Sequence, residues 1–183
     1  MNTQSHPPLA RAAVLAPAAL EPAQYLTFML GSEVFAISIL QVKEIIEYHQ
    51  LTEVPMMPPS VRGVINLRGA VVPVVDPLAR FGRASSPVGK KTCFVIVEVL
   101  SGEDRHVIGV IVDAVNEVLD IAAGDIEPPP SFGTRLRSDF LQGMAKLGGR
   151  FVILLDVDQV LRLDEVGAHA LPQHADVAEA ATV

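Results

Sequence analysis

The chain contains an internal repeat, and this repeat limits its possible folds more than any other feature. Residues 63–80, GVINLRGAVVPVVDPLAR, align at an offset of 80 with residues 143–160, GMAKLGGRFVILLDVDQV. A second block, residues 36–46, aligns at an offset of 73 with residues 109–119. Two matched blocks in the same order indicate duplication of a small unit of roughly 70 residues. The chain is therefore expected to fold as two similar units.

The composition favours strands for each unit. Half of the 183 residues are hydrophobic, tryptophan is absent, and aromatic residues make up only 5%. The core must therefore be aliphatic, and its valine and isoleucine favour β-structure. Short apolar runs between Gly and Pro turns predict an all-β fold of sandwiches or barrels, with short helices. A unit of this size is marginal alone, so the two should pack together and leave a groove between them.

The predicted folded domain covers residues 24–165. Its two halves span about 24–83 and 92–165, partly interleaved, with the Ser-, Pro- and Gly-bearing linker 84–91 between them. Residues 1–23 are rich in Ala and Pro and predict a flexible arm, and residues 166–183 predict a disordered tail. No apolar run approaches the roughly 18 residues needed to span a bilayer. The arm also lacks the pattern of a signal peptide. We expect a cytoplasmic protein with no membrane insertion.

Several kinds of chemistry lack their usual signatures. The net charge is −7 and no Lys/Arg cluster occurs, which argues against nucleic-acid binding. The five histidines lack metal-ligand spacing, and no phosphate loop or nucleophile elbow is present. We therefore expect no metal, no cofactor and no enzymatic activity. The single cysteine, Cys93, excludes an internal disulfide and is expected to be buried in its apolar run.

Asp76 and Asp156 end equivalent strands of the two halves. Paired carboxylates are the catalytic groups of glycosidases, so an acid pair is one interpretation. The other is structural, because each aspartate precedes a short predicted helix, and Asp76 is followed by a proline at the first helical position. We expect both aspartates to be helix N-caps.

Arg68 breaks the repeat, because its counterpart in the second copy is Gly148. A position that the repeated fold accepts as glycine does not need arginine for folding. Arg68 is therefore the first candidate for a partner contact, with its guanidinium at the rim of the groove and able to bind a carboxylate through two hydrogen bonds. The alternative is a solvated turn residue. Glu44 is shared with Glu117 and is less diagnostic, since a charge at a sheet edge explains it equally well.

Four segments together resemble the CheW family of chemotaxis coupling proteins. They are FMLGSEVFAISILQVKEII, VPMMPPSVRGVINLRGAVVPVVDPLARFG, HVIGVIVDAVNEVLDI and FLQGMAKLGGRFVILLDVDQVL, and the resemblance runs over about residues 24–163. It implies two SH3-like five-stranded β-barrels packed around a hydrophobic interface, without catalysis. It also implies an adaptor that joins the cytoplasmic hairpin tip of methyl-accepting chemoreceptors to the regulatory domain of the histidine kinase CheA, in receptor arrays.

The resemblance also assigns receptor-binding residues. Arg68 matches the family arginine tied to receptor and kinase coupling. Val42 and Glu44 match positions near the receptor-binding groove, and Ile39 and Val118 are expected to line the same groove. A helical receptor tip would lie along this apolar floor, oriented by the two charged residues.

A second set of residues matches the loop that meets the kinase or neighbouring adaptors. These are Glu127, Pro128 and Phe132, in the sequence IEPPPSFG. Ser131 stands where the family often carries an acidic residue, so a charged contact is not expected there.

Other functions remain open from the sequence. The chain could be the adaptor of a different chemosensory pathway, such as pilus-based surface motility. It could also be a receiver-fused relative or the kinase's own regulatory domain, although a chain of 183 residues starting at Met1 argues against both. The last alternative is an enzyme.

Overall fold

The computed structural model describes residues 21–129 and 138–162. Within these residues the chain forms eleven strands, two four-residue α-helices and three 3-10 turns, which confirms the all-β prediction. The strands are β1 (Ala23–Leu30), β2 (Glu33–Ser38), β3 (Val42–Glu47), β4 (Val61–Leu67), β5 (Ala70–Val75), β6 (Cys93–Ser101), β7 (Asp104–Val112), β8 (Ala114–Ile121), β9 (Ile126–Glu127), β10 (Leu141–Leu147) and β11 (Arg150–Leu155). The helices are α1 (Pro77–Arg80) and α2 (Val157–Val160), and the 3-10 turns are η1 (Ile39–Gln41), η2 (Ala123–Asp125) and η3 (Ser138–Phe140).

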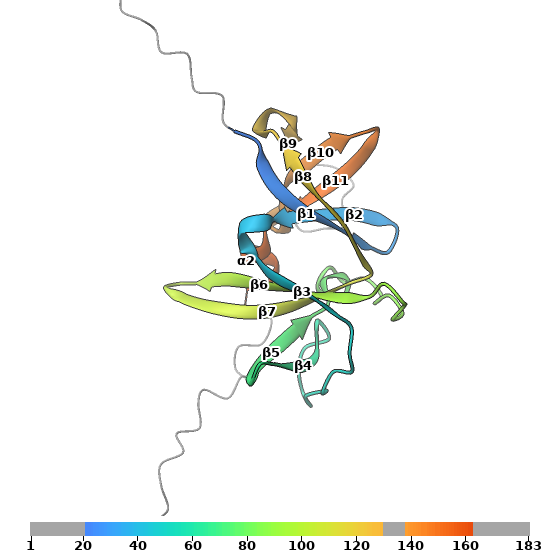
Figure 1. Ribbon diagram of the computed structural model, residues 1–183, viewed down its shortest axis with the longest axis vertical. Coiled ribbons are helices and arrows are strands. Elements are labelled where there is room, and N and C mark those ends of the chain that lie inside the picture. Colours follow the sequence, from blue (N-terminus) through green and yellow to red (C-terminus); the bar gives the residue numbers. More distant parts are fainter. Residues whose placement is uncertain (1–20, 130–137, 163–183) are drawn as a thin grey trace, which may run out of the picture.

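The strands form two sheets, one above the other in Figure 1. The first has the order β8-β1-β2-β11-β10-β9 and the second the order β3-β6-β7-β5-β4. The offsets of the repeat equate β2 with β7, β3 with β8, β4 with β10 and β5 with β11. The two sheets therefore have the same order, and the five-stranded prediction holds with one addition, the two-residue strand β9. Its counterpart in the second sheet is a single bridge between Thr52 and Val64.

The boundary between the sheets differs from the boundary between the repeats. The hairpin β1–β2 belongs to the first repeat but lies between β8 and β11 of the second, pairing antiparallel with β8 and parallel with β11. Likewise β6–β7 lies between β3 and β5 of the first repeat. The ranges 24–83 and 92–165 thus describe the repeats and not the sheets. The first hairpin of each repeat therefore belongs to the sheet that contains the remaining strands of the other repeat.

Each sheet curls into a barrel, as its interior shows. One buried cluster contains Ile121 of β8 and Ala145 of β10, from opposite sides of the first sheet. Another joins Ile65 of β4 to Phe94 of β6, with Ile46 of β3 packed against it. Side chains from opposite edges meet inside only if the sheet closes on itself. We call these units the first barrel (β1, β2, β8–β11) and the second barrel (β3–β7).

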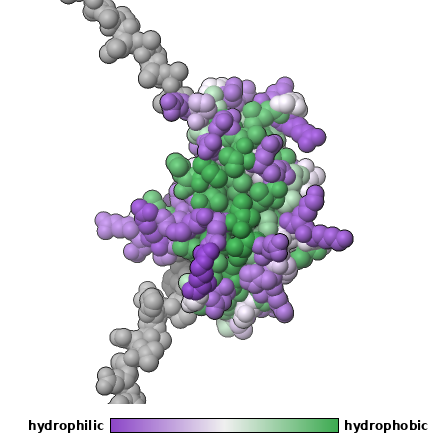
Figure 2. Space-filling view, in the orientation of Figure 1, coloured by the Kyte–Doolittle hydropathy of each residue, from purple (hydrophilic) through white to green (hydrophobic). Residues whose placement is uncertain are grey.

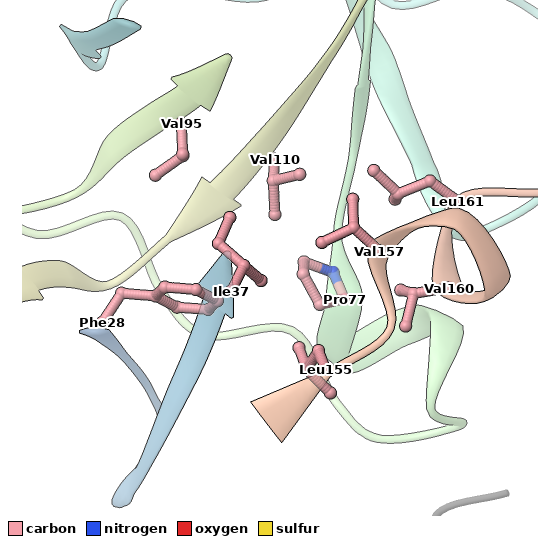
Figure 3. Close-up of a pocket in the computed structure, with 9 residues that line it drawn as sticks. All are labelled: Phe28, Ile37, Pro77, Val95, Val110, Leu155, Val157, Val160 and Leu161. Atoms are coloured by element: carbon pink, nitrogen blue, oxygen red, sulfur yellow. The ribbon is translucent and has the colours of Figure 1, made fainter. Parts of the chain in front are cut away.

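The largest apolar cluster contains residues of both barrels. Alternation along each strand makes this possible: on β6, Val95 and Val97 belong to this shared cluster, while Phe94 and Ile96 face the interior of the second barrel. This explains the continuous apolar run of β6, which is buried on both faces. A small apolar cavity of about 20 Å³ remains in the shared core, lined by residues of both barrels and of α2 (Figure 3). It is too small for any cofactor.

Both aspartates that end equivalent strands are helix caps, as predicted. The Asp76 carboxylate accepts hydrogen bonds from the Leu78 and Ala79 amides at 2.9 and 3.3 Å, and Asp156 accepts one from the Gln159 amide at 3.2 Å. Asp76 is 4% exposed. These interactions give both residues a structural role.

One local prediction needs correction. Cys93 is half-buried, because it is the first residue of β6 and lies where the sheet ends; this partial burial raises the pKa of its thiol, and a backbone hydrogen bond involving Val115 partly offsets the rise. Ser38 is the N-cap of η1. Ser38 accepts a hydrogen bond from the Leu40 amide at 3.4 Å, but the Gln41 side chain donates to Asp158 at 3.3 Å.

Candidate functional site

Arg68 lies in a tight turn that favours glycine. It joins β4 to β5, and its two central residues, Arg68 and Gly69, have φ values of +52° and +86°. The equivalent turn of the first barrel has Gly148 and Gly149, with φ values of +55° and +79°. Positive φ at both central positions defines a type I′ hairpin turn. An L-residue in this conformation costs roughly 1–2 kcal/mol, so the backbone disfavours the arginine that the sequence carries here.

The Arg68 side chain binds Glu44 through two parallel hydrogen bonds. The guanidinium Nη1 and Nη2 atoms donate to the two carboxylate oxygens at 2.7 and 2.8 Å. This hydrogen bonding, together with the Glu44 charge, raises the pKa of Arg68 above its ordinary value. The side chain of Arg68 is 76% exposed, against 25% for Glu44. The pair therefore holds a cation in a fixed orientation on the surface, where a partner can reach it.

The pair also links the two edge strands of the second barrel. Glu44 is on β3 and Arg68 follows β4, and these strands are at opposite ends of the sheet order. Curling of the sheet brings the two residues together. The Arg68 guanidinium, predicted to lie at the rim of the groove between the halves, contacts a residue of its own barrel.

A second group of charges lies beside this pair. Lys43 and Arg105 each form an ion pair with Glu98 at 2.8 Å. Their hydrogen bonds lower the pKa of the Glu98 carboxyl below its usual range. Lys43 precedes Glu44 directly on β3, so the two groups are adjacent along the chain.

The predicted apolar receptor-binding residues occupy different settings. Ile39 and Val42 are partly buried and pack against the shared core. Val118 is 45% exposed on β8, the edge strand of the first barrel. The structure thus brings Arg68 and Glu44 into contact, places Ile39 and Val42 shortly before Glu44 on the same segment, and places Val118 on the other barrel.

Two exposed apolar residues were missed by the sequence analysis. Leu40 is 93% exposed on η1, and Ile45 is 45% exposed on β3. Ile45 is the repeat counterpart of Val118, and both are 45% exposed on edge strands. Comparison of the repeats could therefore have identified Ile45 once Val118 was a candidate. In Figure 2 apolar residues form a band down the middle of the face on which Figure 1 shows β8, β1 and β3, with hydrophilic residues on both sides.

The predicted kinase-facing loop is described only in part. Glu127 ends β9 and Pro128 follows it, and both are exposed. Glu127 pairs with Met144 of β10 at the edge of the first sheet. Phe132 and Ser131 lie outside the described residues.

The described residues contain neither a cluster of potential metal ligands nor an unpartnered buried polar side-chain atom. Across 21–129 and 138–162, no three His, Cys, Asp or Glu side chains are grouped to hold a metal ion. Every buried side-chain nitrogen or oxygen in these ranges has a hydrogen-bond partner. No helix in this part of the chain has the length and apolar character needed to cross a bilayer.

We expect Arg68→Gly to leave the fold intact. Glycine relieves the positive-φ strain, worth roughly 1 kcal/mol, and the exposed ion pair that is lost contributes little to stability. The free energy of unfolding, measured by urea denaturation, should stay unchanged or rise by up to about 1 kcal/mol. A clear loss of stability would show that Arg68 supports the fold.

The fold and the site together define a class of protein: a duplicated SH3-like β-protein with its distinctive charged groups on the surface. The family model described as the CheW-like domain matches residues 24–165. The chain therefore belongs to the CheW-like domain family.

Individual relatives agree with this assignment. The chain is 34% identical over 143 residues to the chemotaxis protein CheW of Klebsiella aerogenes, covering 78% of this chain and 84% of that protein. It is 28% identical to protein FrzA of Myxococcus xanthus, covering 69% of this chain and 76% of that one. A solved structure, the scaffolding protein TtCheW from Thermoanaerobacter tengcongensis, matches with a TM-score of 0.69 and 31% identity, covering 87% of this chain and 93% of that one.

Proposed function

We propose that this chain is a non-catalytic adaptor that couples methyl-accepting chemoreceptors to the histidine kinase CheA. The observation that carries the proposal is Arg68, kept at a position where the backbone favours glycine and held outward by Glu44. The similarity to chemotaxis proteins and to a scaffolding protein supports this role.

The site is suited to a helical partner. Ile39 and Val42 supply apolar surface beside Glu44, and the neighbouring exposed residues Leu40 and Ile45 extend it. An amphipathic helix binds such a surface through its apolar face, while charged residues at the rim fix its register. We propose that the cytoplasmic receptor tip binds here, with Val118 on the first barrel as an additional apolar contact.

The kinase would bind elsewhere. Glu127 and Pro128 are exposed at the edge of the first sheet, which offers backbone groups and side chains to a second partner. We assign this edge, with Phe132, to the regulatory domain of CheA or to a neighbouring adaptor. Separate surfaces for the two partners would recruit the adaptor to receptor arrays.

Arg68→Gly is expected to disrupt coupling without unfolding the protein. In a reconstituted mixture of receptor, CheA and limiting adaptor, receptor-controlled autophosphorylation should fall at least about tenfold, which corresponds to a loss of about 1.4 kcal/mol in binding. Arg83→Ala is the matched control, because Arg83 is also exposed and ion-paired, to Glu33 at 2.7 Å. Normal coupling by Arg68→Gly would refute the role of Arg68.

A second candidate is an adaptor of another chemosensory pathway, such as one that controls pilus-based motility. The similarity to protein FrzA favours keeping it. A pull-down from the native cytoplasm, followed by identification of the receptor and kinase, separates the two. Arg68→Gly should reduce recovery of the receptor in either case.

A further inference from the structure

Equivalent positions near one end of the two barrels carry different side chains. In the second barrel, the Arg68–Glu44 pair and the Glu98 ion pairs join residues of β3, β6, β7 and the β4–β5 turn. The repeat offsets equate Arg68 with Gly148, Glu44 with Glu117 and Lys43 with Asn116. The paired strands equate Glu98 with Met29. Of these charged groups, the first barrel retains only Glu117.

The first barrel is open at this end. A hollow of about 450 Å³ lies between β1, β2, β8 and the β10–β11 turn. Gly148 and Glu117 both line it, the two positions that correspond to Arg68 and Glu44. The hollow therefore lies at the positions where the second barrel carries the Arg68–Glu44 pair.

The hollow has an apolar floor and a polar rim. The floor includes Val34, Leu119, Leu147 and Val152, and the rim carries Asn116, Glu117 and Arg150. Buried Thr27 fixes the Glu117 backbone, since its Oγ1 donates to the Glu117 carbonyl at 2.8 Å and accepts from the Glu117 amide at 3.2 Å. No ion pair to Glu117 occurs within the described part of the chain, including with Arg150. A carboxylate on a hydrogen-bonded strand segment thus borders an apolar hollow without a cation bound to it.

We propose that this hollow is a docking site for an arginine carried on a turn of a partner protein. The guanidinium would bind Glu117 through two hydrogen bonds, as Arg68 binds Glu44, and its methylene stem would lie on the apolar floor. Arginine fits better than lysine because its planar fork matches a carboxylate. Arg150, on the other side of the rim, would bind a carboxylate of the same partner and set its orientation.

The test titrates the full chain with a cyclic peptide, VINLRGAVVP, which copies residues 64–73 and presents an arginine on the required turn. We expect amide chemical-shift changes in the NMR spectrum around Thr27, Glu117 and Leu147. The same peptide with alanine in place of its arginine is the ligand control and should bind at least tenfold more weakly. Glu117→Gln in the protein should weaken binding to a similar extent.

Gly148→Arg is the matched blocking variant. Its φ of +55° is close to the +52° at which Arg68 is accommodated, so the fold should tolerate the arginine. The new side chain should pair with Glu117, fill the hollow and abolish peptide binding, while circular dichroism shows an intact fold. Arg68→Gly, at the other barrel, should leave peptide binding unchanged.

Three results would overturn the proposal. Equal binding of the alanine peptide would show an apolar hollow without arginine recognition. Binding retained by both Gly148→Arg and Glu117→Gln would place the peptide elsewhere. Concentration-dependent shifts around the hollow without peptide, with a dimer in sedimentation, would show that a second copy of the chain occupies it and not a separate partner.

Discussion

Gly63→Ala is expected to destabilise the protein by about 3–5 kcal/mol, among the largest effects of a single substitution. A Cβ at Gly63 would overlap the backbone carbonyl oxygen of Thr52, and its φ of +151° is one that L-residues rarely adopt. The strain cannot relax through a rotamer change, because the obstacle is backbone that pairs with Val64. Urea denaturation monitored by circular dichroism measures the loss.

The repeat supplies a second test of this prediction. Gly143 is the repeat counterpart of Gly63, and the strand register shifts at both glycines as in a β-bulge. A Cβ at Gly143 would lie 2.5 Å from Ile126 Cγ2 and 2.8 Å from the Glu127 carbonyl oxygen. We expect Gly143→Ala to be destabilising as well. Gly124→Ala is the control, because it has no atom within 4 Å of the added Cβ and no positive φ. Equal stability of Gly63→Ala and Gly124→Ala would contradict the steric argument.

Phe35→Ala is expected to cost about 3–5 kcal/mol. Phe35 is fully buried and lies in a row of four rings, stacked on Phe28 at 6.4 Å and on Phe81 at 5.9 Å, with Phe140 following at 5.9 Å from Phe81. The row belongs to the core shared by both barrels. Removing one ring leaves a cavity, because the surrounding side chains belong to several strands and helices that cannot all shift inward to fill it.

The unfolding curve of Phe35→Ala should remain a single transition, because both barrels lose the same core. Hydrogen exchange at amides of β6 and of β11 reports on the two barrels separately, and both should lose protection by similar amounts. Phe151→Ala is the control; Phe151 is 57% exposed and its removal should change stability by no more than about 0.5 kcal/mol. Loss of protection in one barrel alone would show that the barrels unfold independently.

The repeat predicted much of the fold because it compares equivalent positions directly. Shared Asp76 and Asp156 were correctly interpreted as caps, and the shared glycines at 63 and 143 proved to be bulges with no room for a side chain. The exchange of hairpins could not be predicted in the same way. The repeat offset shows which strands are equivalent. It does not show which sheet a hairpin joins, because equivalent strands follow the same order whether each hairpin pairs with its own repeat or with the other.

The candidate site was predicted in part. Comparison of the copies singled out Arg68, and the positive φ shared with Gly148 explains why glycine is accepted there. Its contact with Glu44 could not be foreseen, because the residues are 24 positions apart on strands at opposite ends of the sheet. Cys93 was placed wrongly because an apolar run alone does not show where the sheet ends.

The exchanged hairpins give the linker 84–91 a role beyond connection. A single copy of the repeat, alone, would have an incomplete sheet, and it could complete that sheet only with the hairpin of a second molecule, as in a domain-swapped dimer. In the present chain the tether holds both copies at a high effective concentration. The tether is itself attached, since Ser86 donates to Asp113 at 2.8 Å and the adjacent Arg83 pairs with Glu33 at 2.7 Å. The protein thus corresponds to a domain-swapped dimer joined in one chain, whose assembly does not depend on protein concentration.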